Sequence, residues 1–366
     1  MNNKKIILAG GTGYIGQALA EYFGKENYII ILGRNVTDHE NNAYSDSLLQ
    51  SGNDHRIEYV QWDAKSVAAS WQQHIERADI IINLVGKSVN CRYNAKNKQA
   101  IISSRVQATH ALGEAVARCT VPPKLWINFS SATIYRNAPD RPQDEFTGEI
   151  SEWKKDNMPY NALDQLRSCV KKSIATLLHG KSSDARKQLD LDFSVQVCKL
   201  WEAAFFSHRT PFTRKIALRA AITLGRGGIL TPYLNLCKAG LGGRHGNGKQ
   251  RFSWVHVEDV CRMVAWLWEN KEAEGIYNCA APNAVTNVTF MHTLRMLTGR
   301  RFGLPAPAWL LEPGAWLIRT ETELMLKSRW VVSTRAMQEG FRFKYETIQT
   351  ALHAILADKH PQKTLA

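Results

Sequence analysis

The segment that most constrains the fold is the glycine-rich stretch GGTGYIG at residues 10–16. An apolar run, Lys5–Ala9, precedes it and predicts a buried strand, and the pattern after it predicts an amphipathic helix over Ile15–Phe23. The spaced glycines can supply a tight turn, a close backbone approach to a ligand, and close packing of the helix on the strand. A strand, a glycine loop and a helix in this order predict the first βα unit of a parallel sheet.

Apolar runs and helical patterns continue to alternate through the first half of the chain. Strands are predicted at 28–33, 57–62, 79–85 and 125–130, and helices at 66–76 and 96–119. Several of these strands are apolar at every position, as expected when both faces of a sheet are covered. The alternation predicts right-handed βαβ units and an α/β fold with a Rossmann-type doubly wound parallel sheet in residues 1–150.

The second half of the chain is predicted to complete this core and to add a smaller lobe. A helix at 193–206 and a strand at 215–224 continue the core through 193–225, and a helix at 257–268 and a strand at 276–279 follow. Residues 226–366 are predicted to form a C-terminal substrate lobe. The charge-dense residues 151–190 interrupt the pattern and are predicted to be an insertion or lid.

Composition argues against several classes of protein. No apolar stretch approaches the roughly 20 residues that span a bilayer, and the apolar part of the N-terminus, Ile6–Ala9, is too short for a secretory signal. The seven cysteines are scattered and never spaced C-x-x-C, which argues against a disulfide framework and against a zinc site. We therefore expect a cytoplasmic protein without a metal centre.

The net charge of +14 is concentrated in residues 151–366. A basic half can indicate an anionic ligand, or a nucleic-acid or membrane surface, but interspersed charges also suit an ordinary basic surface. The sequence shows no recognisable nucleic-acid-binding module. A small-molecule substrate is therefore the expected partner, rather than nucleic acid or a membrane, and an oligomer stays open.

The glycine stretch has the context that a dinucleotide-binding fingerprint requires, because it lies between a strand and a helix. Backbone N–H groups at the start of that helix would face the negative charge of a pyrophosphate. The predicted cofactor-binding residues of this loop are Gly10, Gly11, Thr12, Gly13, Tyr14, Ile15 and Gly16.

Arg34 stands at the tip of the second strand, in IILGRN, where NAD-binding proteins carry an acidic residue. A guanidinium can bind the 2′-phosphate of NADP(H) through a forked, charge-assisted hydrogen bond, whereas a carboxylate would repel it. The segment therefore predicts NADP(H) as the cofactor, although a solvent-exposed arginine without a role would leave the same pattern.

Other strand ends supply further cofactor candidates. Asp63 would meet the adenine amine, and the INLVG segment would flank the cofactor, with Gly86 permitting a close backbone approach. The remaining candidates are Asn35, Asn83, Leu84, Val85 and Arg105.

Four segments, GGTGYIG, INLVG, FSSATIY and GNGKQRFSWVHVEDV, together resemble the extended short-chain dehydrogenase/reductases of the NAD-dependent epimerase/dehydratase family. SRVQATHAL, VCKLWEAAF, YNCAAPNAVTN and ETELMLKSRWVVSTRAMQEGFRFKY resemble an atypical epimerase-like subgroup with its own C-terminal domain. The resemblance covers nearly the whole chain except 36–55 and 151–190. It implies NADP(H) binding and an oxidoreductase or epimerase activity, and it names no substrate.

In the superfamily that the chain resembles, a serine polarises the reacting carbonyl or alcohol, and a tyrosine exchanges the proton with help from a lysine four residues later. The serine position matches Ser131 of FSSATIY, and Tyr135 is the tyrosine of that segment. Tyr160 in PYNALD is a third catalytic candidate.

The tyrosine–lysine pair itself is missing. Asp164 stands where a lysine would follow Tyr160, and a carboxylate there would oppose tyrosinate formation. The alternative alignment, through DFSVQVCKLWEAAF, places Phe193 and Val197 at the two positions. Oxidoreductase chemistry by the usual route is therefore in doubt, and Tyr135 is the remaining candidate for the proton donor.

Four residues of the second half of the chain resemble positions that close over a substrate: Arg219, Gln250, Trp254 and His256. His256 has a second interpretation, as a structural histidine that caps the helix starting near Glu258 and Asp259.

Three functions stay open. The first is an NADP(H)-dependent oxidoreductase or epimerase-like enzyme that acts on a small metabolite by hydride transfer. The second is a nucleotide-sugar epimerase or dehydratase, and the third is a non-catalytic NADP(H)-binding regulatory or scaffold protein. The missing tyrosine–lysine pair favours the third, while the glycine loop and Arg34 suit all three.

Overall fold

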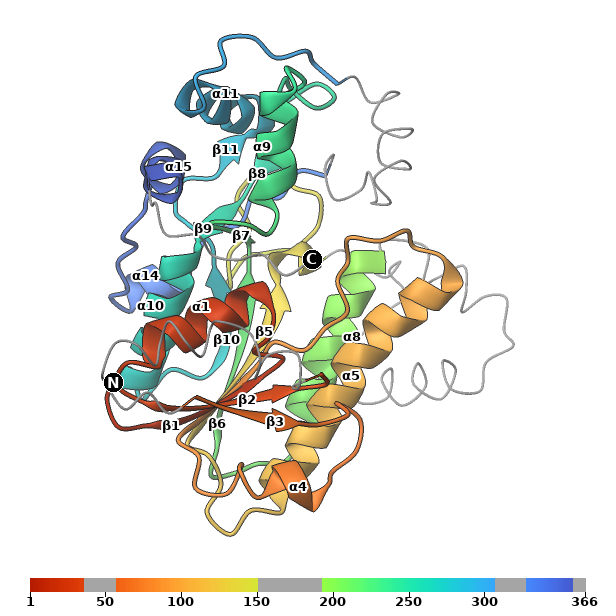
Figure 1. Cartoon of the computed structure of the whole chain (residues 1–366), viewed down its shortest axis with the longest axis vertical. Coiled ribbons are helices and arrows are strands. Elements are labelled where there is room, and N and C mark those ends of the chain that lie inside the picture. The colour runs from red at the N-terminus through yellow and green to blue at the C-terminus, as the bar shows by residue number, and fades with distance from the viewer. Residues whose placement is uncertain (36–56, 151–192, 307–326, 358–366) are drawn as a thin grey trace.

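The computed structural model describes residues 1–35, 57–150, 193–306 and 327–357 (Figure 1). Seven described strands form one parallel sheet in the order β10-β6-β5-β4-β1-β2-β3. They are β1 (Lys5–Ala9), β2 (Tyr28–Gly33), β3 (Ile57–Gln61), β4 (Ile80–Asn83), β5 (Leu125–Ser131), β6 (Arg214–Ala220) and β10 (Gly275–Cys279). The order reverses between β1 and β4, which defines a doubly wound sheet and confirms the predicted fold class.

Helices cover both faces of this sheet (Figure 1). On one face lie α1 (Tyr14–Phe23) and α10 (Val257–Glu269), and on the other lie α5 (Ala95–Ala117), α8 (Phe193–Ser207) and the short α4 (Ala69–Gln72). Ile6 and Leu8 of β1 pack into the first layer, whereas Ile7 packs into the second. Because side chains alternate between two covered faces, the strand is apolar at every position after Lys5.

The second lobe has a core of its own, at the top of Figure 1. Its helices are α9 (Leu230–Lys238), α11 (Asn287–Leu297) and α15 (Ile348–Ala357), and α14 (Thr334–Gln338) packs nearer to β10. Its strand pairs are β7 (Ile222–Leu224) with β9 (Trp254–His256), and β8 (Arg251–Phe252) with β11 (Val285–Thr286).

The strand predicted at 215–224 is divided into two. β6 ends at Ala220, and β7 begins at Ile222 and pairs with β9 outside the main sheet. The N–H of Ala221 donates to the carbonyl of Cys279, at 2.9 Å, at the point where the chain leaves the sheet. The division carries the chain from the core into the second lobe.

The helix predicted at 66–76 is shorter than expected, because α4 spans only Ala69–Gln72. The Asp63 carboxylate accepts hydrogen bonds from the N–H groups of Lys65 and Ser66, which holds that stretch as a turn. Arg77 adopts a positive φ of 58°, which excludes a continuous helix to the next strand.

The predicted insertion at 151–190, and Tyr160 with it, lies outside the described residues. Within the described ranges, no helix combines the length and the apolar character needed to cross a membrane.

Candidate functional site

The glycine loop lies between β1 and α1, at the carboxyl edge of the sheet where β1 and β4 part. Gly10 has a φ of +75°, and a side-chain carbon added there would lie 3.1 Å from the backbone of Val85. A side-chain carbon at Gly16 would lie 2.5 Å from Cα of Gly11, so this glycine allows α1 to pack on the loop. Gly13 differs, since an added carbon would meet only the carbonyl oxygen of Gly10, at 3.5 Å. At Gly11 an added carbon would lie 2.9 Å from Cβ of Leu8, so the loop has three crowded glycines and one open one.

The start of α1 suits a phosphate group. Gly13 is the N-cap residue of α1 and makes no side-chain capping hydrogen bond, so no side chain occupies the positive end of the helix dipole. Gln17 steadies the loop, because its Nε2 donates to the carbonyl of Thr12 at 3.1 Å. An uncapped helix start beside an open glycine fits the pyrophosphate of a dinucleotide.

Arg34 and Asn35 directly follow β2, and both are exposed. Nε2 of Gln61, on the neighbouring β3, donates to the carbonyl of Arg34 at 3.4 Å. The backbone is therefore held on the sheet, while the exposed side chain remains available to a ligand.

Asp63 is also exposed, but its carboxylate stabilises the turn that follows it in the chain. It accepts from the N–H groups of Lys65 and Ser66, each at 2.9 Å, and from Oγ of Ser66 at 2.6 Å. The geometry favours a structural role for Asp63, and its contact with adenine stays a prediction.

Gly86 makes room for Arg105 of α5. A side-chain carbon at Gly86 would lie 2.7 Å from Cζ of Arg105. Nη1 of Arg105 donates to the carbonyls of Lys87 and Ile101, at 3.1 and 3.0 Å, and the guanidinium lies 5.1 Å from the centre of the Trp201 ring. Burial lowers the pKa of this guanidinium. The close approach seen at Gly86 is therefore to an arginine of this chain, and both residues stay cofactor candidates.

Asn83 fixes the end of β4 from the interior. Its Nδ2 donates to Oγ1 of Thr109 at 3.0 Å and to Oδ1 of Asn128 at 2.6 Å. Its Oδ1 accepts from the N–H of Val85 at 3.1 Å. Asn83 is fully buried, so it orients Leu84 and Val85 rather than presenting its own side chain to a ligand.

Ser131 is the last residue of β5 and is half-buried at the carboxyl edge of the sheet. Its Oγ accepts from the N–H of Thr133 at 3.2 Å and from Oγ1 of Thr133 at 3.1 Å. Oγ1 of Thr133 also lies 3.4 Å from Sγ of Cys198. The hydroxyl of Ser131 is therefore oriented by a neighbour and has its own proton left to donate.

Tyr135 belongs to an interior polar cluster. Its hydroxyl donates to Oδ1 of Asn278 at 3.0 Å and accepts from Nη1 of Arg219 at 2.9 Å. Arg219 in turn donates from Nε and Nη2 to the carboxylate of Glu202, at 2.9 and 2.8 Å. Oγ of Ser130 donates to the same carboxylate at 2.6 Å.

The burial of this cluster argues against two predictions made from the sequence. Tyr135 is 1% exposed, so its hydroxyl is not in reach of a substrate, although burial raises the pKa of this hydroxyl and keeps its proton in place. Arg219, predicted to close over a substrate, is 4% exposed and is the partner of Glu202. Both side chains are committed to the interior.

Trp254 and His256 are also held inside. Nε1 of Trp254 donates to the carbonyl of Asn283 at 3.1 Å, and the ring lies in the core of the second lobe. Nδ1 of His256 accepts from the N–H of Glu258 at 3.1 Å, and burial lowers the pKa of this imidazole to about 4. His256 is the N-cap of α10, which favours its structural interpretation. Gln250 is half-buried, and its Nε2 donates to the carbonyl of His245 at 3.1 Å.

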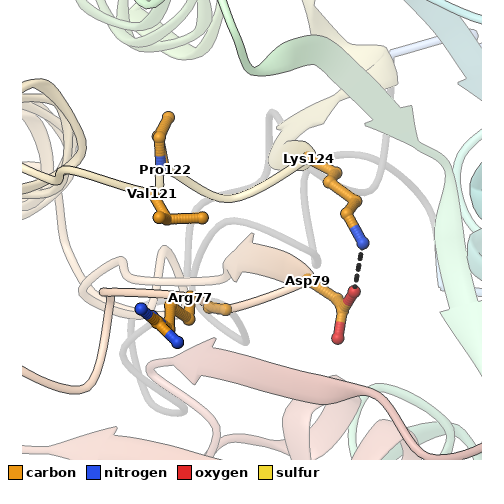
Figure 2. Close-up of a pocket in the computed structure, with 6 residues that line it drawn as sticks. Arg77, Asp79, Val121, Pro122 and Lys124 are labelled. Carbon is orange, nitrogen blue, oxygen red and sulfur yellow. Dashed lines mark hydrogen bonds and ion pairs between the residues drawn. The ribbon is translucent and has the colours of Figure 1, made fainter.

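Figure 2 shows a hollow at the opposite edge of the sheet. It is lined by Arg77, Ala78, Asp79, Val121, Pro122 and Lys124. Nζ of Lys124 lies 3.0 Å from Oδ1 of Asp79, and these residues immediately precede β5 and β4. Because doubly wound sheets bind ligands at the carboxyl ends of their strands, this hollow is not the candidate site.

The sheet order and the glycine loop together define an NAD(P)-binding fold of the Rossmann type. Residues 6–166 match the model of the NAD dependent epimerase/dehydratase family, and residues 306–355 match a domain of unknown function, DUF1731. The two matches agree with the family and the C-terminal domain that the sequence resembles, and the predicted resemblance is confirmed.

Known proteins match this chain along nearly its whole length. Epimerase family protein YfhF of Bacillus subtilis is 27% identical over 355 residues, which cover 97% of this chain and 98% of that protein. Epimerase family protein SDR39U1 of Homo sapiens is 26% identical over 363 residues, which cover 96% and 100%. The crystal structure of human SDR39U1 (isoform2) with NADPH matches with a TM-score of 0.71 at 23% identity, covering 96% of this chain and 98% of that chain.

A UDP-N-acetylglucosamine 4-epimerase from Methanobrevibacter ruminantium, in complex with UDP-N-acetylmuramic acid, matches with a TM-score of 0.63 at 13% identity. This match covers 97% of this chain and 98% of that chain, and it shows that the fold is shared.

Proposed function

We propose that this chain is an NADP(H)-dependent oxidoreductase or epimerase-like enzyme that acts on a small metabolite by hydride transfer. The observation that carries the proposal is the open Gly13 at the uncapped start of α1, with an exposed Arg34 at the tip of the adjacent β2. The crystal structure of human SDR39U1 with NADPH supports the same cofactor.

Different residues of the site would bind different parts of NADP(H). Backbone N–H groups of the glycine loop would hold the pyrophosphate, and the Arg34 guanidinium would bind the 2′-phosphate. Leu84 and Val85 would border the cofactor at the end of β4, where the N–H of Val85 donates to the buried side chain of Asn83. When bound, the nicotinamide supplies a hydride donor or acceptor.

Ser131 is the proposed catalytic residue. Because Thr133 donates twice to its Oγ, the Ser131 proton can be directed at a substrate oxygen, where a hydrogen bond favours hydride addition to a carbonyl. Tyr135 keeps the predicted proton-donor role in this proposal only if its segment moves, because its hydroxyl is buried. Its raised pKa would suit an acid, in reduction, better than a base.

One observation favours the non-catalytic alternative. Phe193 and Val197, at the aligned tyrosine and lysine positions, are buried in an apolar cluster between α5 and α8. No proton chemistry is possible at those two side chains. The nucleotide-sugar alternative has only the shared fold in its favour.

The proposed domain assignment follows the sequence prediction. The cofactor core comprises residues 1–150 and 193–225, the substrate side belongs to 226–366, and the location is cytoplasmic. The partner is a small molecule, and the oligomeric state stays open.

Two measurements test the proposal. Titration with NADPH and with NADH, followed by nucleotide fluorescence, should show tighter binding of NADPH, and equal affinities would contradict the assignment of Arg34.

NADPH consumption should then be screened over carbonyl metabolites and nucleotide sugars. Ser131→Ala should lower turnover without weakening NADPH. Tight NADPH binding with no turnover on any compound would favour the non-catalytic alternative, and sugar epimerisation without net NADPH consumption would favour the nucleotide-sugar epimerase.

A further inference from the structure

Tyr14 joins the glycine loop to the second lobe. Its backbone is part of the loop, and its side chain lies against residues 225–229, which connect β7 to α9. A side-chain carbon added at Gly225 would lie 2.0 Å from Oη of Tyr14, and one added at Gly228 would lie 3.5 Å from Cδ1. The tyrosine side chain therefore rests directly on the backbone of this connection, with its hydroxyl at Gly225 and its ring at Gly228.

The hydroxyl of Tyr14 contributes no hydrogen bond to this contact. It is buried and has no partner in the described part of the chain, and burial raises its pKa. An unpaired buried hydroxyl is destabilising, so the contact must be held by packing of the ring. Phenylalanine should consequently fill the same place.

The connection leads straight into the core of the second lobe. Leu224, just before Gly225, pairs with His256 of β9, and Cγ1 of Val257 would lie 2.8 Å from a side-chain carbon at Gly225. Leu230, Tyr233 and Cys237 of α9 pack in the second-lobe core. The start of α9 is thus held between its own lobe and Tyr14.

We propose that Tyr14 is a positioning residue, through which occupancy of the glycine loop fixes the β7–α9 connection and hence the substrate side of the protein. The inference rests on the proposed binding of NADP(H) at this loop. A phosphate bound by the loop restrains the backbone of Tyr14, and the restrained ring then restrains residues 225–229. Because such coupling is reciprocal, a disturbance at Gly225 weakens the cofactor.

Hydrogen–deuterium exchange of the full chain, with and without NADPH, tests the proposal. NADPH should slow exchange at 10–16 and also at 225–229, the latter by about 5- to 150-fold, the usual span of coupling between two sites. Tyr14→Phe should keep both effects. Tyr14→Ala, or Tyr14→Leu if the alanine variant does not fold, should keep slowed exchange at 10–16 and lose it at 225–229.

Gly225→Ala tests the same coupling in the opposite direction, from the β7–α9 connection to the glycine loop. It should weaken NADPH in the wild-type background, and it should weaken NADPH much less in the Tyr14→Ala background, where the added methyl still meets Val257 but no longer meets the Tyr14 side chain. NADPH binding that slows exchange at 10–16 alone in the wild type, or slowed exchange at 225–229 that survives Tyr14→Ala and Tyr14→Leu, would overturn the inference while leaving the proposed function intact. Failure of the wild type to bind NADPH would overturn both.

Discussion

Glu202 and Arg219 form a two-point ion pair in the interior of the protein, with both oxygens of the carboxylate accepting from the guanidinium. The same pair holds Ser130 through Glu202 and Tyr135 through Arg219. The 3-10 turn η1 (Ala132–Ile134) lies between those two residues. The segment that carries Ser131 is therefore tied at each end to one ion pair.

Removal of one partner of this pair should be costly, because it leaves the other buried without compensation. We expect Glu202→Leu to lower the free energy of unfolding by about 3–5 kcal/mol, measured by urea denaturation. The double variant Glu202→Leu/Arg219→Met should recover a large part of that loss. Equal stability of the single variant and the wild type would show that the pair does not stabilise the fold.

Two alanine substitutions in the glycine loop should separate packing from ligand approach. At Gly16 the added methyl would lie 2.5 Å from Cα of Gly11, so Gly16→Ala should displace α1 and lower the melting temperature. At Gly13 the space is open, so Gly13→Ala should fold normally but bind NADPH more weakly, because the methyl occupies the side from which a phosphate would approach. Calorimetry and NADPH titration on both variants check the pair, and unchanged NADPH affinity in Gly13→Ala would place the phosphate elsewhere.

Arg34→Asp should weaken NADPH far more than NADH. Loss of one charge-assisted contact costs about 1.5–3 kcal/mol, which corresponds to roughly 10- to 150-fold in affinity. Lys25→Asp, at another exposed cation, makes the same change in net charge and serves as the control. A similar loss for both variants would indicate a general field effect rather than a 2′-phosphate contact.

Stability should fall as the pH is lowered from about 6.5 to about 4, the interval between the unfolded and folded pKa values of two buried histidines. Burial lowers the pKa of both His245 and His256 to about 4, so below pH 6.5 the unfolded chain binds the extra protons. Each histidine can contribute up to about 3 kcal/mol of this loss.

The His245 contribution can be isolated, because its ring stacks on Tyr233 and its Nδ1 has no partner among the described residues. Urea unfolding at several pH values should show a shallower decline in His245→Phe. His353→Gln, at an exposed position of α15, should leave the slope as in the wild type. A decline of equal steepness in His245→Phe would remove His245 from the explanation.

The core of the sheet could be predicted from the sequence because its signals are local. Continuous apolar runs such as Ile80–Asn83 and the glycine loop each indicate their own structure without reference to distant residues. The helices α9, α11 and α15 are not among the predicted elements, since each is short and its apolar residues become a core only by packing within the second lobe. The break after Ala220 escapes prediction for the same reason, because it depends on pairing with β9.

The same distinction between local signals and distant contacts applies to the candidate site. The open Gly13 and the exposed Arg34 lie where the sequence pattern predicted them, since a fingerprint describes backbone and strand ends. The interior position of Tyr135 and Arg219 could not be foreseen from their own segments, because it depends on Glu202 of the helix α8. A glutamate on an otherwise apolar helix face was the one available signal of a buried partner.

The place of β6 in the sheet has a consequence for how the chain is made. β6 pairs with β5 on one side and β10 on the other, yet it follows β5 in the sequence by a long interval. While the chain emerges from the ribosome, β5 is an edge strand of apolar residues, and its backbone N–H and C=O groups on one side stay unpaired until β6 is made. Open apolar edges of this kind recruit other chains, and non-local parallel pairing closes slowly. We therefore expect the nascent N-terminal half to be the stage at which this protein is most exposed to aggregation.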